Sequence, residues 1–82
     1  MKPIQNLGIG GYAFKLENDA AERLRGYIGT LENHYLSMEG GREIMEGIEE
    51  RIAELLLDKK SDVVTLADVL RVIDIIGSPE HI

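Results

Sequence analysis

The sequence has no cysteine, no long apolar run and fewer basic than acidic residues. The lack of cysteine excludes disulfide bonds, thiolate metal sites and cysteine nucleophiles. No apolar stretch approaches the roughly 18 to 20 residues that cross a bilayer, and no apolar signal core opens the chain. The 15 acidic residues against 9 basic ones give a net charge of -6. A surface of that sign repels phosphate backbones and anionic lipid headgroups, so nucleic acid is an unfavourable partner.

The length bounds what the chain can build. With 82 residues, of which 44% are hydrophobic, it has the composition of an ordinary soluble globular protein. A chain this short forms one domain with a modest core, which leaves little material for a deep active-site cavity. We therefore predict a single domain over residues 1–82.

The N-terminal segment alternates apolar residues around a glycine pair. Leu7 and Ile9 precede Gly10-Gly11, and Tyr12 and Phe14 follow it. Two short strands joined by a tight turn have this pattern. With the glycine pair as the turn, Ile9 faces Tyr12 and Leu7 faces Phe14, and all four share one apolar face.

Three later segments have apolar residues at the three- and four-residue spacing of an amphipathic helix, over about 19–38, 42–59 and 66–76. Gly26 and Gly29 lie inside the first, where each costs about 1 kcal/mol relative to alanine. Either the helix is weakened there or another part of the chain packs close to its backbone. The apolar stripes consist of Ala20, Leu24, Tyr27, Ile28, Leu31, Tyr35 and Met38; of Ile44, Ile48, Ile52, Leu55 and Leu56; and of Leu66, Val69, Leu70, Ile73 and Ile76.

Polar and glycine residues mark the helix ends. Asn18 or Asp19 is expected to cap the first helix, because a short side-chain oxygen accepts the free N–H groups of a first turn. Gly40-Gly41 is expected to end that helix in a left-handed conformation. Thr65 with Asp68 three residues later has the spacing of a capping box for the third helix.

These elements predict an α+β fold, mostly α, with an N-terminal β-hairpin over about 4–17 packed on a three-helix arrangement (ββααα). Val63-Val64, just before the third helix, is briefly β-like. A two-stranded hairpin is barely stable alone in water. It is expected to lie against the helices or to pair with another chain, so homodimerisation through the hairpin edge or its apolar face is a further expectation.

Candidate catalytic chemistry is sparse. Glu46, Glu50, Glu54 and Asp58 lie four residues apart and form an acidic row on the second helix. The row is interpreted first as a solvated face and second as a surface for a basic partner, since a straight row spreads carboxylates too widely for a metal ion. An enzyme would require these carboxylates to converge with His34. We expect no catalytic residue, cofactor or metal, and hence no enzyme activity.

We therefore expect the domain to act by binding another protein. An alternative function is a small DNA-binding transcriptional regulator that uses the helix over about 66–76, although that helix has two acidic residues and one arginine. The predicted interaction surface consists of Leu7, Ile9, Tyr12, Phe14, Glu46, Glu50 and Glu54.

An ordered set of short pieces gives the chain a resemblance to a known family. The pieces are Gly11-Tyr12-Ala13-Phe14-Lys15-Leu16-Glu17, Ala20-Ala21-Glu22-Arg23-Leu24 with Tyr27 and Leu31, Glu39-Gly40-Gly41-Arg42-Glu43-Ile44-Met45, Ile48-Glu49-Glu50-Arg51-Ile52-Ala53-Glu54-Leu55, Val64-Thr65-Leu66-Ala67-Asp68-Val69 and Ile76-Gly77-Ser78-Pro79-Glu80. In this order they resemble the N-terminal cytoplasmic region of Bacteroidetes-type PspC-domain proteins, the phage-shock-protein C-like membrane stress regulators. The second half is also similar to the membrane-tethered signalling modules called HAAS domains.

The resemblance implies a cytoplasmic sensing or protein-interaction module of a membrane-stress system, with no catalytic residue. It implies that a membrane segment follows the Gly-Ser-Pro-Glu end, so we expect the chain to be cut from a longer membrane protein. The full-length protein would place this domain at the cytoplasmic face of the inner membrane. The chain as given is expected to be soluble and to reach the membrane only through the missing C-terminal segment.

Overall fold

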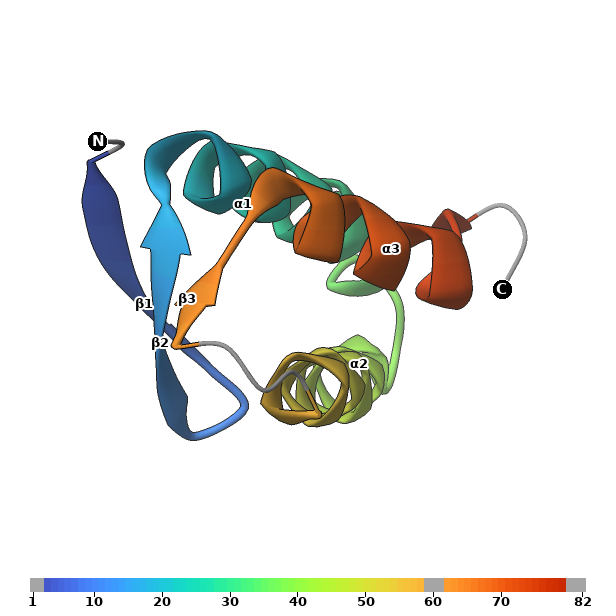
Figure 1. Ribbon diagram of the computed structural model, residues 1–82. Coiled ribbons are helices and arrows are strands. Elements are labelled where there is room, and N and C mark those ends of the chain that lie inside the picture. Colours follow the sequence, from blue (N-terminus) through green and yellow to red (C-terminus); the bar gives the residue numbers. More distant parts are fainter. Residues whose placement is uncertain (1–2, 59–61, 80–82) are drawn as a thin grey trace.

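The computed structural model describes residues 3–58 and 62–79 and confirms an α+β, mostly α fold (Figure 1). A β-hairpin precedes two helices, and a short third strand then leads into the last helix. In chain order the elements are β1 (Ile4–Ile9), β2 (Tyr12–Glu17), α1 (Asn18–Tyr35), α2 (Gly41–Leu57), β3 (Val63–Val64) and α3 (Leu66–Ile76).

The hairpin has the predicted register. Strands β1 and β2 are antiparallel, with Leu7 opposite Phe14 and Ile9 opposite Tyr12. The turn between them is Gly10-Gly11, with φ of 59° and 88°. Two consecutive positive φ angles match the twist of a two-residue hairpin, and glycine adopts them without a steric penalty.

A third strand extends the hairpin into a sheet of order β1-β2-β3. The β-like pair Val63-Val64 lies parallel to β2, with Val63 opposite Lys15 and Val64 opposite Leu16. Parallel neighbours need a long crossover connection, which α1 and α2 supply here. As a result β2 is the central strand and β1 is an edge strand.

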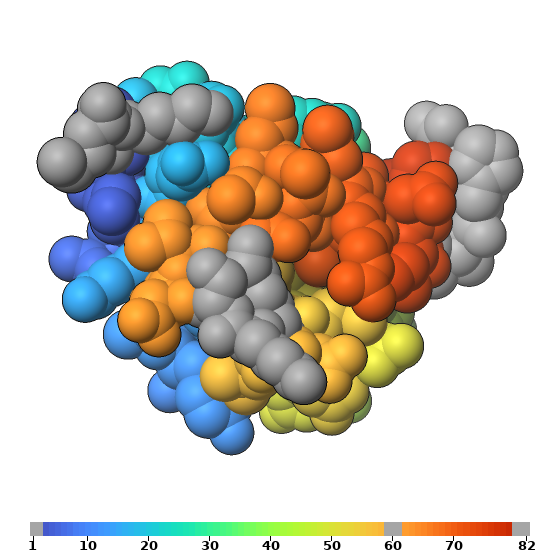
Figure 2. Space-filling model, in the orientation of Figure 1, coloured from blue at the N-terminus to red at the C-terminus, as the bar shows by residue number. Residues whose placement is uncertain are grey.

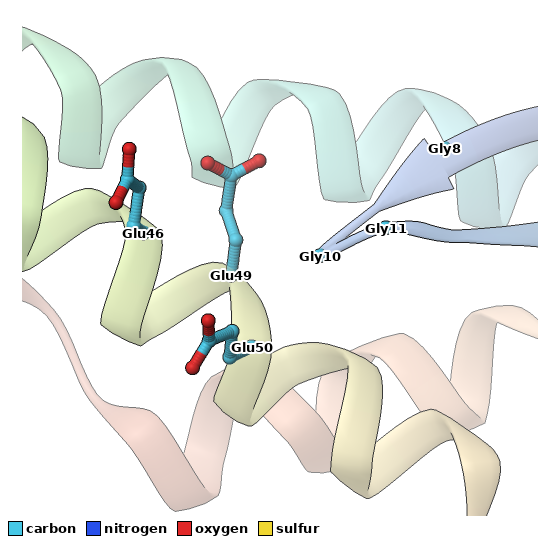
Figure 3. Close-up of a pocket in the computed structure, with 6 residues that line it drawn as sticks. All are labelled: Gly8, Gly10, Gly11, Glu46, Glu49 and Glu50. Carbon is cyan, nitrogen blue, oxygen red and sulfur yellow. The ribbon is translucent and has the colours of Figure 1, made fainter.

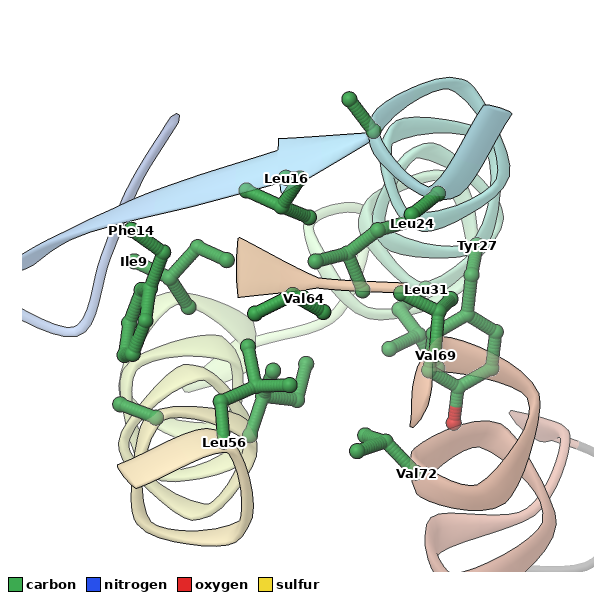
Figure 4. Close-up of a cluster of buried hydrophobic side chains, with 14 of the residues drawn as sticks. Ile9, Phe14, Leu16, Leu24, Tyr27, Leu31, Leu56, Val64, Val69 and Val72 are labelled. Atoms are coloured by element: carbon green, nitrogen blue, oxygen red, sulfur yellow. The ribbon is translucent and has the colours of Figure 1, made fainter. Parts of the chain in front are cut away.

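The core lies between the sheet and the helices (Figure 4). In Figure 1 the three helices all lie to one side of the sheet. The alternation of β1 and β2 therefore sends one set of side chains into the core and leaves the other set exposed. The largest fully buried side chains are Ile9, Leu16, Leu24, Leu31, Ile52 and Val69.

The expected N-cap position of α1 is wrong, although Asp19 Oδ1 accepts the first-turn N–H of Ala20 at 2.8 Å. The helix begins at Asn18, and Glu17 occupies the N-cap position. The side chain of Asn18 is engaged elsewhere, because its Oδ1 accepts a hydrogen bond from the amide Nε2 of Gln5 on β1. Gln5 in turn accepts a hydrogen bond from Arg25 Nη1 at 2.6 Å. The first turn of α1 is therefore tied to the edge strand.

The first helix also ends earlier than predicted, at Tyr35 rather than at about residue 38. The chain then turns tightly, since the N–H of Met38 donates to the Tyr35 carbonyl at 3.0 Å and the N–H of Gly41 donates to the Met38 carbonyl at 3.1 Å. The glycine pair begins α2 instead of ending α1: Gly40 is left-handed, with φ of 76°, and Gly41 is the first helical residue. Met38 is consequently exposed and outside the core.

The buried stripe of α2 agrees with the prediction at Ile52 and Leu56 and differs at the start of the helix. Ile44 is 40% exposed, whereas the neighbouring Met45 is 3% exposed. Helix α2 ends at Leu57, and the remainder of its predicted range includes residue 59, which lies outside the described residues.

The third helix spans the predicted range, and its capping box is confirmed. The N–H of Thr65 donates to Asp68 Oδ2 at 2.8 Å, and the N–H of Asp68 donates to Thr65 Oγ1 at 3.3 Å. At the other end, the N–H of Gly77 donates to the Ile73 carbonyl at 2.8 Å. The hydroxyl of Tyr27 on α1 donates to the Gly77 carbonyl. This bond joins the end of α3 to α1.

Gly26 and Gly29 have no packing role among the described residues. A Cβ built on either glycine meets no described atom within 4 Å. Of the two explanations that the sequence left open, close packing against this part of α1 is therefore not found.

Candidate functional site

The hairpin turn lies directly on helix α2. A Cβ on Gly10 would lie 3.0 Å from the Glu49 carbonyl oxygen and 3.1 Å from the Ala53 Cβ, closer than side chains normally approach. In the space-filling view, the blue hairpin turn lies beside the gold C-terminal end of α2 (Figure 2). Glycine allows this contact, together with the positive φ of the turn, without strain. The contact brings the two parts of the predicted interaction surface together.

The hairpin residues of that predicted surface divide between core and solvent. Ile9 and Phe14 are buried, and Leu7 is partly buried against the same cluster. All three side chains therefore support the fold, and Ile9 and Phe14 are not accessible to a partner. Tyr12 lies on the same face of the hairpin, beyond the end of the core, and is 53% exposed. Its ring centroid is 6.4 Å from that of Phe14.

Tyr12 lines a shallow depression, here named the hairpin–α2 surface and defined as Gly10, Tyr12, Glu50, Glu54 and Leu57. Its volume is about 280 Å³. Leu57 is 50% exposed, so two large apolar side chains face solvent beside two exposed carboxylates. Exposed apolar groups framed by charge are a common composition of a protein-contact surface.

A second depression, here named the acidic cleft, lies on the other side of the turn. Its volume is about 430 Å³, and it is lined by Gly8, Gly10, Gly11, Glu46, Glu49 and Glu50. Figure 3 shows Glu46 and Glu49 directed to one side of α2 and Glu50 to the opposite side. The predicted acidic row is shared between the two depressions: Glu46 lines the acidic cleft, Glu54 lines the hairpin–α2 surface, and Glu50 lines both.

The charges in this region repel one another. Partial burial raises the pKa of Glu49, and the negative charges of Glu32 on α1 and Glu46 raise it further. Glu54 accepts a hydrogen bond from Arg51 Nη1 at 3.4 Å, but both side chains are largely exposed, so this ion pair stabilises little. The resulting negative potential favours a cationic group at either depression.

The described residues show no buried polar site and no group of metal ligands. No polar or charged residue in residues 3–58 and 62–79 is buried. Within those same ranges no three His, Asp or Glu side chains are grouped so that they could hold a metal ion. His34 is exposed and stacks edge-on against Tyr35, with ring centroids 4.8 Å apart. Neither depression includes it.

The exposed face of α3 is mixed. Its exposed residues are Ala67, Leu70, Arg71, Asp74 and Ile75. A helix that reads DNA presents several cations to the phosphates, and this face presents one arginine beside one aspartate. No observation on α3 favours the DNA-binding alternative.

Sequence reasoning missed five residues of the two depressions, namely Gly8, Gly10, Gly11, Glu49 and Leu57. Leu57 belongs to an apolar run, and its exposure depends on where α2 ends. Glu49 is three residues from Glu46, a spacing that also places side chains on one helical face and could have signalled the pair. The packing role of Gly10 has no local signal, because it depends on a backbone contact with a distant helix.

None of the described helices combines the length and apolar character needed to cross a membrane. Comparison with protein-family models, with curated proteins and with solved structures finds no match to this chain.

Proposed function

We propose that this domain is a non-catalytic, cytoplasmic protein-interaction module of a PspC-like membrane stress-response protein, and that its contact site is the hairpin–α2 surface. The observation that carries the site is the close packing of Gly10 on α2. Because the turn packs on α2, Tyr12 of the hairpin and Leu57 of α2 line the same depression.

The chemistry of the surface defines the partner. Tyrosine supplies a large contact area at low entropic cost, and the exposed Leu57 provides a second apolar anchor. Glu50 and Glu54 flank these anchors, so a matching segment carries an apolar side chain next to Lys or Arg. Binding such a segment would bury the apolar pair and offset the repulsion among the carboxylates of α2.

Site-specific photo-crosslinking in the full-length protein, in its native cells, tests the contact site. A photoreactive phenylalanine analogue replaces Tyr12 in one variant and Asn33 in the control. Asn33 is exposed on α1 and lines neither depression. We expect a discrete adduct from position 12 that is lost on Glu50→Lys/Glu54→Lys, and none from position 33. No adduct at position 12, or the same adduct at both positions, would contradict the proposal.

The membrane part of the proposal rests on the family resemblance and has its own test. An open reading frame that continues beyond residue 82 into an apolar span of about 20 residues would support a tethered module. A stop codon at that point would contradict the tether and leave the contact site to be judged by crosslinking alone.

A further inference from the structure

Strand β1 is the open edge of the sheet. It pairs with β2 on one side, and no other described strand pairs with it. Figure 1 shows β1 at the outer margin of the molecule, with the helices beyond the other strands. Its first residue, Ile4, is 50% exposed. An edge of this kind presents unpaired backbone groups to solvent.

The register identifies which backbone groups are unpaired. In a two-residue hairpin the residues that flank the turn form a hydrogen-bonded pair, and bonded and non-bonded pairs then alternate. Ile9 flanks the turn, so the odd-numbered residues of β1 direct their N–H and C=O groups toward β2. Ile4, Asn6 and Gly8 therefore direct theirs away from the sheet.

This edge lacks the features that normally prevent pairing. Edge strands are usually protected by charged side chains, by proline or by a bulge. Strand β1 has the sequence Ile-Gln-Asn-Leu-Gly-Ile, and its register with β2 is continuous over all six residues. No charged residue occurs between Pro3 and Phe14, although 29% of the chain is charged.

We propose that β1 pairs with β1 of a second copy of this chain, antiparallel about a two-fold axis at Asn6. Two molecules that each carry a charge of -6 repel over most of their surface, and the uncharged edge is where they can approach. The pairing places Ile4 opposite Gly8 of the second copy and gives a continuous sheet of two hairpins.

The side chains fit this register. Ile4, Asn6 and Gly8 lie on the face of the sheet that the helices leave open. Among the described residues, the Cβ position of Gly8 has one neighbour within 4 Å, the Tyr12 carbonyl oxygen at 3.9 Å, so the exposed Ile4 of the second copy has room to lie over it. The two Asn6 amides face each other at the axis, where each can donate to and accept from the other.

One cation beside the strand, Arg25, lies toward an acidic region of the second copy under the two-fold axis. At one end of β1, Arg25 donates to Gln5. At the other end, Gly8 borders the acidic cleft that contains Glu46 and Glu49. Antiparallel pairing sets Gln5 opposite Leu7 of the second copy, which brings Arg25 to the side of the second copy's acidic cleft. A two-fold interface requires this self-complementarity.

Amide hydrogen exchange on the wild-type domain tests the pairing without any substitution. One strand pair per interface buries little area, so we expect a weak dimer. Its population should rise as the protein concentration is raised from about 20 µM to about 1 mM. Over that range, exchange at Ile4, Asn6 and Gly8 should slow by about tenfold or more, while exchange at Leu7 and Ile9 stays slow throughout. Free exchange at the three edge amides in a molecule that sediments as a monomer at about 1 mM would overturn the proposal.

A matched pair of variants locates the interface. Asn6→Lys places two like charges opposite each other at the axis and is expected to raise the dimer dissociation constant by about tenfold or more. Ala13→Lys adds the same charge on the same open face, but on the central strand β2, and should leave association near that of wild type. Equal effects of the two substitutions, with both variants folded by circular dichroism, would overturn the register. Neither substitution touches the hairpin–α2 surface, so crosslinking from position 12 reports on the proposed function separately.

Discussion

Two sets of glycines in this chain differ in both sequence context and structure: Gly10 and Gly41 belong to Gly-Gly pairs, whereas Gly26 and Gly29 stand singly inside a helix. Gly10 and Gly41 each lie against another segment of backbone, whereas Gly26 and Gly29 on α1 face open space. The first set determines where α2 lies relative to the hairpin and to α1. The second set only lowers the stability of the helix that contains it. The contrast separates glycines required by packing from glycines whose replacement would improve the fold.

The packing of Gly10 also affects the proposed contact site. The hairpin–α2 surface exists because the turn can approach α2, so the glycine at position 10 positions a tyrosine two residues away. A larger residue there would change the surface without altering any exposed side chain. Substitutions at the glycines therefore test the fold and the proposed contact site together.

The largest effect is expected from Gly41→Ala. A Cβ at this position would overlap the carbonyl oxygen of Tyr35, so the connection between α1 and α2 must shift. We expect the free energy of unfolding to fall by about 3 kcal/mol or more, a large share of the total for a small domain. Urea denaturation followed by circular dichroism measures it. A Gly41→Ala variant as stable as wild type would show that Gly41 does not lie against the Tyr35 carbonyl.

Gly10→Ala is expected to have the next largest effect. It should lower the free energy of unfolding by about 2 kcal/mol, because Gly10 combines a positive φ with the close contact on Glu49. Gly11→Ala is the matched control, since Gly11 also has positive φ but its Cβ would meet no described atom within 4 Å. The control should lower the free energy of unfolding by only about 1 kcal/mol. Equal losses in urea denaturation would mean that the turn does not pack on α2.

Gly26→Ala and Gly29→Ala are expected to act in the opposite direction. Each should raise the free energy of unfolding by about 0.5 to 1 kcal/mol, because alanine favours the helix and restricts the unfolded chain. The shift in thermal midpoint measures the gain. Destabilisation by either substitution would indicate that this face of α1 packs against something after all.

The smallest effect is a pH dependence at Glu49. Its raised pKa means that the folded state disfavours the charged carboxylate, through partial burial and neighbouring negative charges, so Glu49→Gln should stabilise the fold at neutral pH by about 0.3 kcal/mol. The gain should vanish as the pH falls below about 4.3, because the carboxyl is then protonated in both the folded and the unfolded states. Stability curves at several pH values, with Glu39→Gln as a control for loss of one charge, measure it. A gain independent of pH would contradict the charge explanation.

Features governed by neighbouring residues could be predicted from the sequence. The glycine pair and the alternation around it determined the pairing of Leu7 with Phe14, and the Thr65 capping box depends on residues three apart. The α+β class followed from the same local periods.

Features that depend on distant contacts could not be predicted. The parallel pairing of Val64 with Leu16 joins residues far apart in the chain. A strand of two residues is too short for its sequence pattern to indicate which strand it pairs with. The burial of Met45 in place of Ile44 depends on how α2 is rotated against the rest of the core, which the apolar spacing of α2 alone leaves open. For the candidate site, the sequence identified Tyr12 and the carboxylates separately, and the fold showed which of them meet.

The central claim is that the hairpin turn packs against α2, and a nuclear Overhauser measurement on the wild-type domain tests it most directly. A Cβ on Gly10 would lie 3.1 Å from the Ala53 Cβ, so a glycine Hα occupies that direction. We predict a strong cross-peak between the Gly10 Hα and the Ala53 methyl group. Absence of any cross-peak between the turn and residues 49–53 of α2, in a sample whose hairpin cross-peaks are intact, would contradict the account.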